Sequence, residues 1–160
     1  MIVLDANILI RAVLGRRVRH LLDTYTAHGV GFYAPDVAFV DAQKYLPPLL
    51  VKRGKPVADV SAAIDFLQHI VEPVDQEFYV LFEAEARQRL RGRDEDDWPV
   101  LTTALGLACA VWTEDSDFFG TGIRVGVLGL PKAMAQGILM PPAWPLVTRG
   151  SDDARHDHSY

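Results

Sequence analysis

Aspartate side chains that could hold a metal ion occur where apolar, strand-like runs end and where an apolar helical repeat begins. Asp5 follows the apolar run 2–4, and Asp115 comes soon after a second apolar run, 110–112. Asp97 stands just before a helical repeat of apolar residues. Because sites in open parallel sheets form at the carboxyl ends of the strands, we expect these carboxylates to lie at one edge of a sheet.

Crowded carboxylates repel one another, and a divalent cation relieves that repulsion. Oxygen ligands without histidine or cysteine favour Mg²⁺ or Mn²⁺ over zinc. Such a cation activates a bound water and stabilises charge on a phosphodiester oxygen. These residues therefore predict metal-assisted hydrolysis of a phosphate ester.

Structural roles for the acidic residues stay open beside the chemical one. Asp5 or Asn7 could cap the helix that starts near residue 8. Asp94 and Asp96 are expected to be caps or solvated charges. Asp41 lies inside a predicted helix, where a carboxylate taken alone is more typical of a solvated face.

Short strands alternate with helical segments along the chain, which predicts βαβ units with right-handed crossovers and a parallel sheet. A kink or restart is expected at Pro47–Pro48, and one more short helix could extend to about Met140. The predicted strands cover residues 2–4, 31–34, 70–74, 110–112 and 123–128, and the predicted helices cover residues 8–14, 18–28, 36–46, 57–69, 76–91 and a segment starting between 96 and 98.

The 160 residues are 49% hydrophobic and 23% charged, which is typical of one globular domain. We expect this domain to span residues 1–140, with an irregular tail over 141–160. A net charge of −5 argues against binding nucleic acid by global attraction but allows a local basic rim. Neither a membrane-spanning run nor a signal sequence is recognisable, so a cytoplasmic location with no membrane partner is expected. Cys109, the only cysteine, is expected to be a buried thiol.

Four stretches resemble the motifs of the PIN-domain nucleases, a family that includes the VapC-like toxins. They are DANILI at 5–10, the helix entry from Pro35 to Asp41, Asp97 with Ala104, and TEDSDF at 113–118. The resemblance covers about residues 1–128. Where the family usually has glutamate in its second motif, this chain has Asp41.

The resemblance implies a three-layer α/β/α fold with a central five-stranded parallel sheet. It implies Mg²⁺- or Mn²⁺-dependent cleavage of RNA, with supporting roles for Asn7, Thr113 and Asp117. An antitoxin partner and a homodimer are implied by the VapC-like members. The metal ligands that the resemblance implies are Asp5, Asp41, Asp97 and Asp115.

Two other functions share features with this sequence. A haloacid-dehalogenase-like phosphatase also has an aspartate after its first strand, but it needs a second one two positions on, where this chain has Asn7. A catalytically inactive PIN-like binding module stays open as the alternative. Asp41 in place of glutamate and the acidic net charge both support that alternative.

Overall fold

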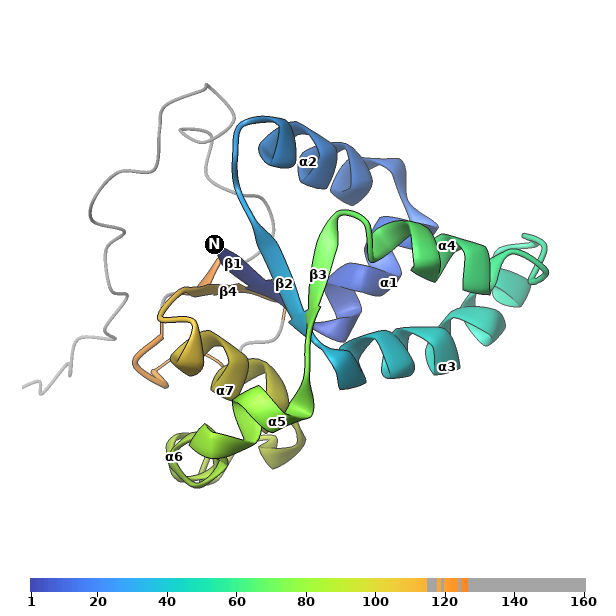
Figure 1. Cartoon of the computed structure of the whole chain (residues 1–160). Coiled ribbons are helices and arrows are strands. Elements are labelled where there is room, and N and C mark those ends of the chain that lie inside the picture. The colour runs from blue at the N-terminus through green and yellow to red at the C-terminus, as the bar shows by residue number, and fades with distance from the viewer. Residues whose placement is uncertain (115–117, 119, 124, 127–160) are drawn as a thin grey trace, which may run out of the picture.

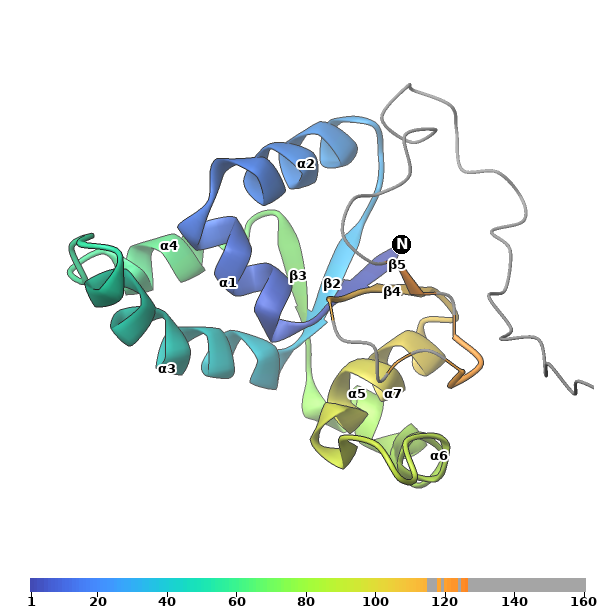
Figure 2. The same ribbon diagram turned by 180° about the vertical axis from the view of Figure 1, so that it is seen from behind.

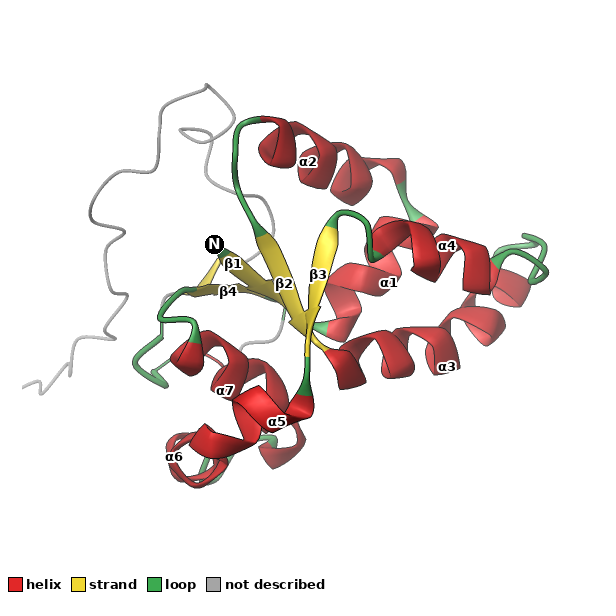
Figure 3. Ribbon diagram, viewed as in Figure 1, coloured by secondary structure: helices red, strands yellow, loops and turns green. Residues whose placement is uncertain are grey.

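A parallel β-sheet with helices on both faces forms the centre of the protein, as seen in a computed structural model that describes residues 1–114, 118, 120–123 and 125–126 (Figure 1; Figure 3). The strands lie in the order β3-β2-β1-β4-β5, and all their pairings are parallel. The strands are β1 (Ile2–Leu4), β2 (Phe32–Pro35), β3 (Val71–Val74), β4 (Ala110–Trp112) and β5 (Val125–Gly126).

The predicted α/β fold with a parallel sheet is confirmed. Strands β1 to β4, of three or four residues each, lie within one residue of the strands predicted from the sequence. Of the fifth strand predicted over 123–128, Val125–Gly126 form β5 and pair with β4, Ile123 is outside the strand, and positions 124, 127 and 128 lie outside the described residues. Within the described residues the sheet therefore has four strands of three or four residues and a two-residue β5 at its edge. The predicted helix to Met140 and the tail lie outside the described residues.

Helices connect successive strands. Helices α1 and α2 join β1 to β2, α3 and α4 join β2 to β3, and α5 to α7 join β3 to β4. None of the described helices is long and apolar enough to cross a membrane. The helices are α1 (Ala6–Leu14), α2 (Arg16–Ala27), α3 (Asp36–Lys52), α4 (Val60–Leu67), α5 (Gln76–Tyr79), α6 (Glu83–Arg89) and α7 (Trp98–Gly106), with 3-10 turns η1 (Val80–Phe82) and η2 (Glu95–Asp97).

Helix α3 continues through Pro47 and Pro48, so the predicted kink or restart there is wrong. Each proline removes one helical N–H donor. The two carbonyl groups that lose their donors belong to exposed residues four positions earlier, where water can replace the missing bond. Leu46 and Leu50 are buried in the core on either side of the prolines, and this packing keeps the helix on the sheet.

The segment 76–91, predicted as one helix, is instead divided into α5, η1 and α6. Its aromatic side chains pack tightly on α7, where a Cβ atom added to Gly106 would lie 2.8 Å from the ring of Phe78 and 3.0 Å from that of Phe82. The breaks let the chain bend around α7 while both rings stay in contact. Helical periodicity alone did not reveal this bend.

Two hydrophobic cores lie on opposite faces of the sheet. Ile2 and Leu4 of β1 pack with residues of α1 to α4, whereas Val3 packs with α6 and α7. This alternation is the two-residue period of a strand that is buried on both faces. Figure 2 shows α1 to α4 together and α5 to α7 apart from them, which gives three layers.

The order of the strands reverses between β1 and β4. From β1 the chain moves to β2 and then β3 on one side, and it returns to place β4 on the other side of β1. Right-handed crossovers then carry the helices of the two halves to opposite faces. The carboxyl ends of β1 and β4 therefore flank a topological switch point, the place where ligands bind in open parallel sheets.

Candidate active site at the carboxyl ends of β1 and β4

Asp5 directly follows β1 at the switch point and is only 5% exposed. Its backbone is extended, and its Oδ1 accepts a hydrogen bond of 2.8 Å from the backbone N–H of Ile8. Of the two proposed caps of α1, Asp5 is therefore the one that is used. The positive end of the helix dipole also favours a carboxylate at this position.

Thr113 directly follows β4 and is fully buried. Its hydroxyl group donates a hydrogen bond to Oδ2 of Asp5. Because Leu4 and Trp112 are paired in the sheet, this bond joins the two strands where their ladder ends. The Asp5 carboxylate thus has one oxygen bonded to α1 and the other bonded to the end of β4, which fixes its orientation.

Asp97 is at the N-cap position of α7, as predicted. Helix α7 runs back to the amino end of β4, so its own N-terminus lies at the same sheet edge as Asp5. Asp97 is half-buried, and its Oδ2 atom is buried. The next residue, Trp98, packs 5.7 Å from Tyr79 and 5.0 Å from the guanidinium group of Arg87, measured to the ring centre. These contacts brace the start of α7.

Asp41 is half-buried in the second turn of α3, the helix that starts at the carboxyl end of β2. Helix α3 packs against α1, which begins at Asp5. Within the described part of the chain, the Asp41 side chain forms no hydrogen bond or ion pair. Its role as a ligand stays a prediction.

Three other residues were predicted to belong to the site: Asn7, Asp115 and Asp117. Asp115 and Asp117 lie outside the described residues, and Asn7 is exposed in the first turn of α1. Among the residues that the structure describes, no three acidic, histidine or cysteine side chains converge closely enough to hold a metal ion.

The donor chemistry of this edge nevertheless fits Mg²⁺ or Mn²⁺. The candidate ligands are all carboxylates, and Mg²⁺ needs only one or two of these because it keeps several waters. Cys109 precedes β4 and so lies at the opposite edge of the sheet. Burial raises the pKa of the Cys109 thiol, which keeps it protonated and a poor metal ligand at neutral pH.

Asp36 is a strand-end carboxylate that sequence reasoning did not consider. It directly follows β2, and it accepts hydrogen bonds from the backbone N–H of Val37 at 2.7 Å, the N–H of Gln76 at 3.3 Å and the hydroxyl of Tyr79 at 2.6 Å. Burial, the bond to Asp36 and its negative charge raise the pKa of Tyr79. Its place after a strand, like that of Asp5, was a signal that could have drawn attention to it.

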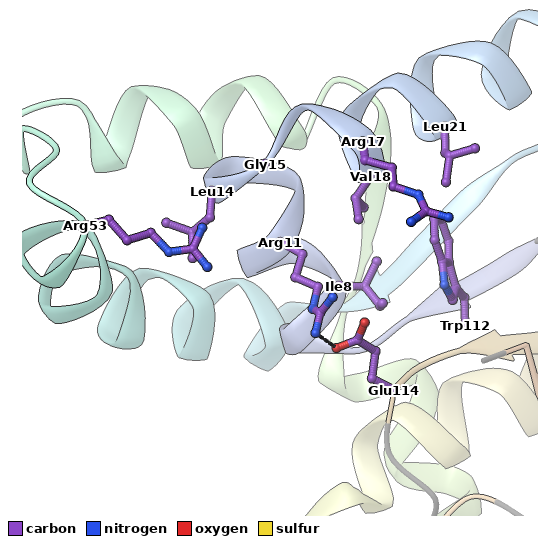
Figure 4. A pocket seen from close by; sticks show the side chains of 10 residues that line it. All are labelled: Ile8, Arg11, Leu14, Gly15, Arg17, Val18, Leu21, Arg53, Trp112 and Glu114. Atoms are coloured by element: carbon purple, nitrogen blue, oxygen red, sulfur yellow. Dashed lines mark ion pairs between the residues drawn. The ribbon is translucent and has the colours of Figure 1, made fainter. Parts of the chain in front are cut away.

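Arg11 and Glu114 form an ion pair that nothing in the sequence indicated. Arg11 is in α1, and Glu114 follows Thr113, so the pair adds a second link between α1 and the end of β4 (Figure 4). The Glu114 side chain is 17% exposed, so the pair is shielded from solvent more than an ordinary surface salt bridge is. The polar contacts around Asp5 therefore come from two segments that are distant in sequence.

The family model described as the PIN domain matches residues 3–144. The chain belongs to the PIN-domain family. This PIN-domain family consists of nucleases, which act as hydrolases. No curated protein matches the chain significantly.

Two solved structures are similar to this PIN-domain protein in fold. The structure of VapBC2 from Rickettsia felis bound to a DNA fragment from its promoter matches with a TM-score of 0.60 and 15% identity, over 79% of this chain and 98% of that chain. The structure of VapBC-1 from nontypeable Haemophilus influenzae matches with a TM-score of 0.55 and 18% identity, again over 79% and 98%. At these identities the likeness shows the fold.

Proposed function

We propose that this PIN-domain protein is a metal-dependent endoribonuclease that hydrolyses RNA phosphodiester bonds. The observation that carries the proposal is Asp5, a buried carboxylate at the topological switch point, held by α1 on one side and by Thr113 on the other. Asp97 begins α7 at the same edge. Membership of a nuclease family supports hydrolysis of a phosphodiester.

The proposed ligands of Mg²⁺ or Mn²⁺ are the carboxylates of Asp5, Asp41, Asp97 and Asp115. When bound, the cation would supply an activated water and stabilise charge on the phosphate. Thr113 orients Asp5 through its hydroxyl group. Asp41 has a shorter side chain than the usual glutamate, so we propose that it holds the metal through a water molecule. Supporting roles of Asn7 and Asp117 belong to the same proposal.

Metal binding is tested by thermal unfolding with and without Mn²⁺. A ligand at about 100 times its dissociation constant stabilises by about 2.7 kcal/mol, so the melting temperature should rise by several degrees. Asp97→Asn should reduce this rise, whereas Asp96→Asn, an exposed neighbour with the same change of charge, should not. An equal rise in both variants would count heavily against a site at Asp97.

Catalysis is tested by incubating single-stranded RNA with the wild type in Mn²⁺. Cleavage should be lost in Asp5→Asn, Asp97→Asn and Asp115→Asn and kept in Asp96→Asn. A wild type that responds to metal in thermal unfolding but leaves every RNA intact would favour the catalytically inactive binding module.

We further propose that the protein is the toxin of a toxin–antitoxin pair and forms a homodimer. Support comes from the two VapBC structures, which are toxin–antitoxin complexes. Co-expression with a small protein encoded next to this chain should yield a complex that no longer cleaves RNA, and light scattering should give the mass of two copies for the protein alone. A monomer, or a neighbouring protein that neither binds nor inhibits, would contradict these two assignments without touching the nuclease.

A further inference from the structure

A cavity of about 310 Å³ lies beside the candidate active site, between α1, α2 and the end of β4 (Figure 4). It shares a wall with that site. Ile8 lines the cavity, and its backbone N–H is the donor to Asp5. Glu114 also lines the cavity and directly follows Thr113, the other partner of Asp5. A ligand in the cavity would therefore extend from the Asp5 edge.

The charge of the cavity is opposite to that of the whole protein. Three arginines and one glutamate line it, although the net charge of the chain is −5. Arg11 is neutralised by its ion pair with Glu114. The guanidinium groups of Arg17 and Arg53 form no ion pair or hydrogen bond with any residue that the structure describes. Two arginines that have no acidic partner among the described residues thus face a space next to a proposed phosphodiesterase site.

The arginines are spread along the cavity instead of meeting at one point. Figure 4 shows Arg17 beside Trp112, Arg53 near Leu14, and Arg11 between them. Separate cations along one cavity suit a ligand with repeated negative charges, because each phosphate of a strand can pair with its own guanidinium group. The apolar part of the lining offers contact to a ribose or a base.

We propose that this cavity binds the RNA strand next to the bond that is cleaved, with Arg17 and Arg53 contacting phosphates of the flanking nucleotides. Arg11 has a different role, because its pair with Glu114 removes a negative charge that would repel the strand close to Asp5. This inference rests on the proposed ribonuclease function, and it adds a location and a direction for the bound strand.

The experiment measures RNA binding without cleavage. A fluorescein-labelled oligouridine of about ten nucleotides, a length in the range of single-strand binding sites, is titrated with protein in EDTA and followed by fluorescence anisotropy. The cavity variant is Arg17→Gln/Arg53→Gln. The matched control is Arg16→Gln/Lys52→Gln, which removes the same charge from exposed chain neighbours that do not line the cavity.

The cavity variant should bind the RNA about tenfold more weakly, which corresponds to about 1.4 kcal/mol, while the control stays within about twofold of wild type. The slope of log affinity against log salt should fall by about 1.4, since each lost phosphate contact of a single strand contributes about 0.7. A second variant, Arg17→Lys/Arg53→Lys, keeps both charges and should retain most of the salt slope. Unchanged melting temperatures establish that the variants fold.

Equal affinities of the cavity and control variants would overturn the inference, as would a wild type that binds no RNA. A labelled acidic amphipathic peptide of alternating glutamate and leucine is the other probe. If only its binding depends on Arg17 and Arg53, the cavity takes a protein partner instead. Failure of the proposed function is a distinct result, because a wild type that binds RNA through these arginines yet never cleaves it would leave the inference standing.

Discussion

An aspartate directly follows each of the strands β1 and β2, but the two aspartates have different roles. Asp5 follows β1 and Asp36 follows β2, and each is the first acidic residue after its strand. The oxygens of Asp36 accept three hydrogen bonds from α3 and α5. The partners of Asp5 come from α1 and from Thr113 at the end of β4.

Strand order explains this difference. Strand β2 lies between β1 and β3, and the chain passes from β2 directly to β3, so no reversal occurs there. Helix α5 then follows β3 and contacts Asp36 through Tyr79. At β1 and β4 the strand order reverses, and open parallel sheets bind ligands at such a point. Whether a carboxylate at a strand end braces the fold or belongs to the candidate active site therefore depends more on its surroundings than on its local sequence.

The largest expected effect comes from exchanging the Asp5 carboxylate for an amide. Asp5→Asn should lower RNA cleavage by at least about a thousandfold, because metal stabilisation of the transition state amounts to several kcal/mol. Stability should change little, since asparagine caps a helix as well as aspartate does. Cleavage rates in Mn²⁺ and urea unfolding of the same samples check both parts.

Asp36→Ala is the matching change at β2, and it should lower stability but largely preserve cleavage. It leaves the buried Tyr79 hydroxyl without its partner, which should cost about 1–3 kcal/mol of unfolding free energy. Cleavage per folded molecule should stay within about tenfold of wild type. If Asp36→Ala abolished cleavage in a fully folded protein, the division between a bracing and a catalytic carboxylate would be wrong.

The next largest effect is expected at Asp41. If Asp41 is a metal ligand, the helix that follows β2 also contributes to the site. Asp41→Asn should lower cleavage by about 10- to 100-fold, the range for residues that act on a metal indirectly. Asp41→Glu restores the residue usual in the family and should keep or raise the affinity for Mn²⁺. Titrating cleavage against Mn²⁺ measures this, and unaltered metal dependence in both variants would remove Asp41 from the site.

Thr113→Val keeps the shape of a buried side chain and removes the hydroxyl that holds Asp5. Cleavage should fall by about tenfold, at the lower end of the effects of such supporting residues. Thr113→Ser keeps the hydroxyl and should restore most of the activity. Equal activity of the serine and valine variants, measured at saturating Mn²⁺, would mean that packing and not the hydrogen bond matters at this position.

Much of the fold could be predicted from the sequence, because buried strands are short apolar runs, as in β1, β2 and β4. The edge strand β3 differs, since its Glu72 and Pro73 are exposed. The start of α7 at Trp98 lies within the range of 96 to 98 predicted from the apolar helical repeat, with Pro99 tolerated in the first turn. The passage of α3 through Pro47 and Pro48 was not predicted, because tertiary packing of its last turns outweighs local propensity. Local patterns cannot show such packing.

The candidate site was predictable only in part. Strand ends and helix starts located Asp5 and Asp97 at one edge of the sheet. The bond from Thr113 to Asp5 and the ion pair of Arg11 with Glu114 depend on how β4 inserts next to β1, which periodicity does not reveal. The place of Asp36 after a strand was visible in the sequence, but its bonds to Gln76 and Tyr79 of α5 join segments about 40 residues apart, and local patterns do not reveal them.

The smallest expected effect concerns the bracing role of Asp36, and two buried tyrosines test it. Tyr79 donates to Asp36, whereas within the described residues the Tyr25 hydroxyl has no hydrogen-bond partner. Tyr79→Phe should therefore lower stability by about 1 kcal/mol, and Tyr25→Phe should leave it unchanged or raise it slightly. Urea unfolding at neutral pH measures both, and cleavage should be unaffected in each.

Alkaline pH separates these tyrosines further. The pKa of Tyr79 in the folded protein lies above the ordinary value of 10.0, because of burial, its hydrogen bond to Asp36 and that negative charge, in that order. Above pH 10 the unfolded chain loses this proton first, so stability is complete below that pH and falls as the pH rises above it. Tyr79→Phe should flatten this fall more than Tyr25→Phe, whose pKa is raised by burial alone. If stability fell equally with pH in both variants, the hydrogen bond to Asp36 would not stabilise the protonated form of Tyr79. Packing on α7 would then have to fix α5 over β2.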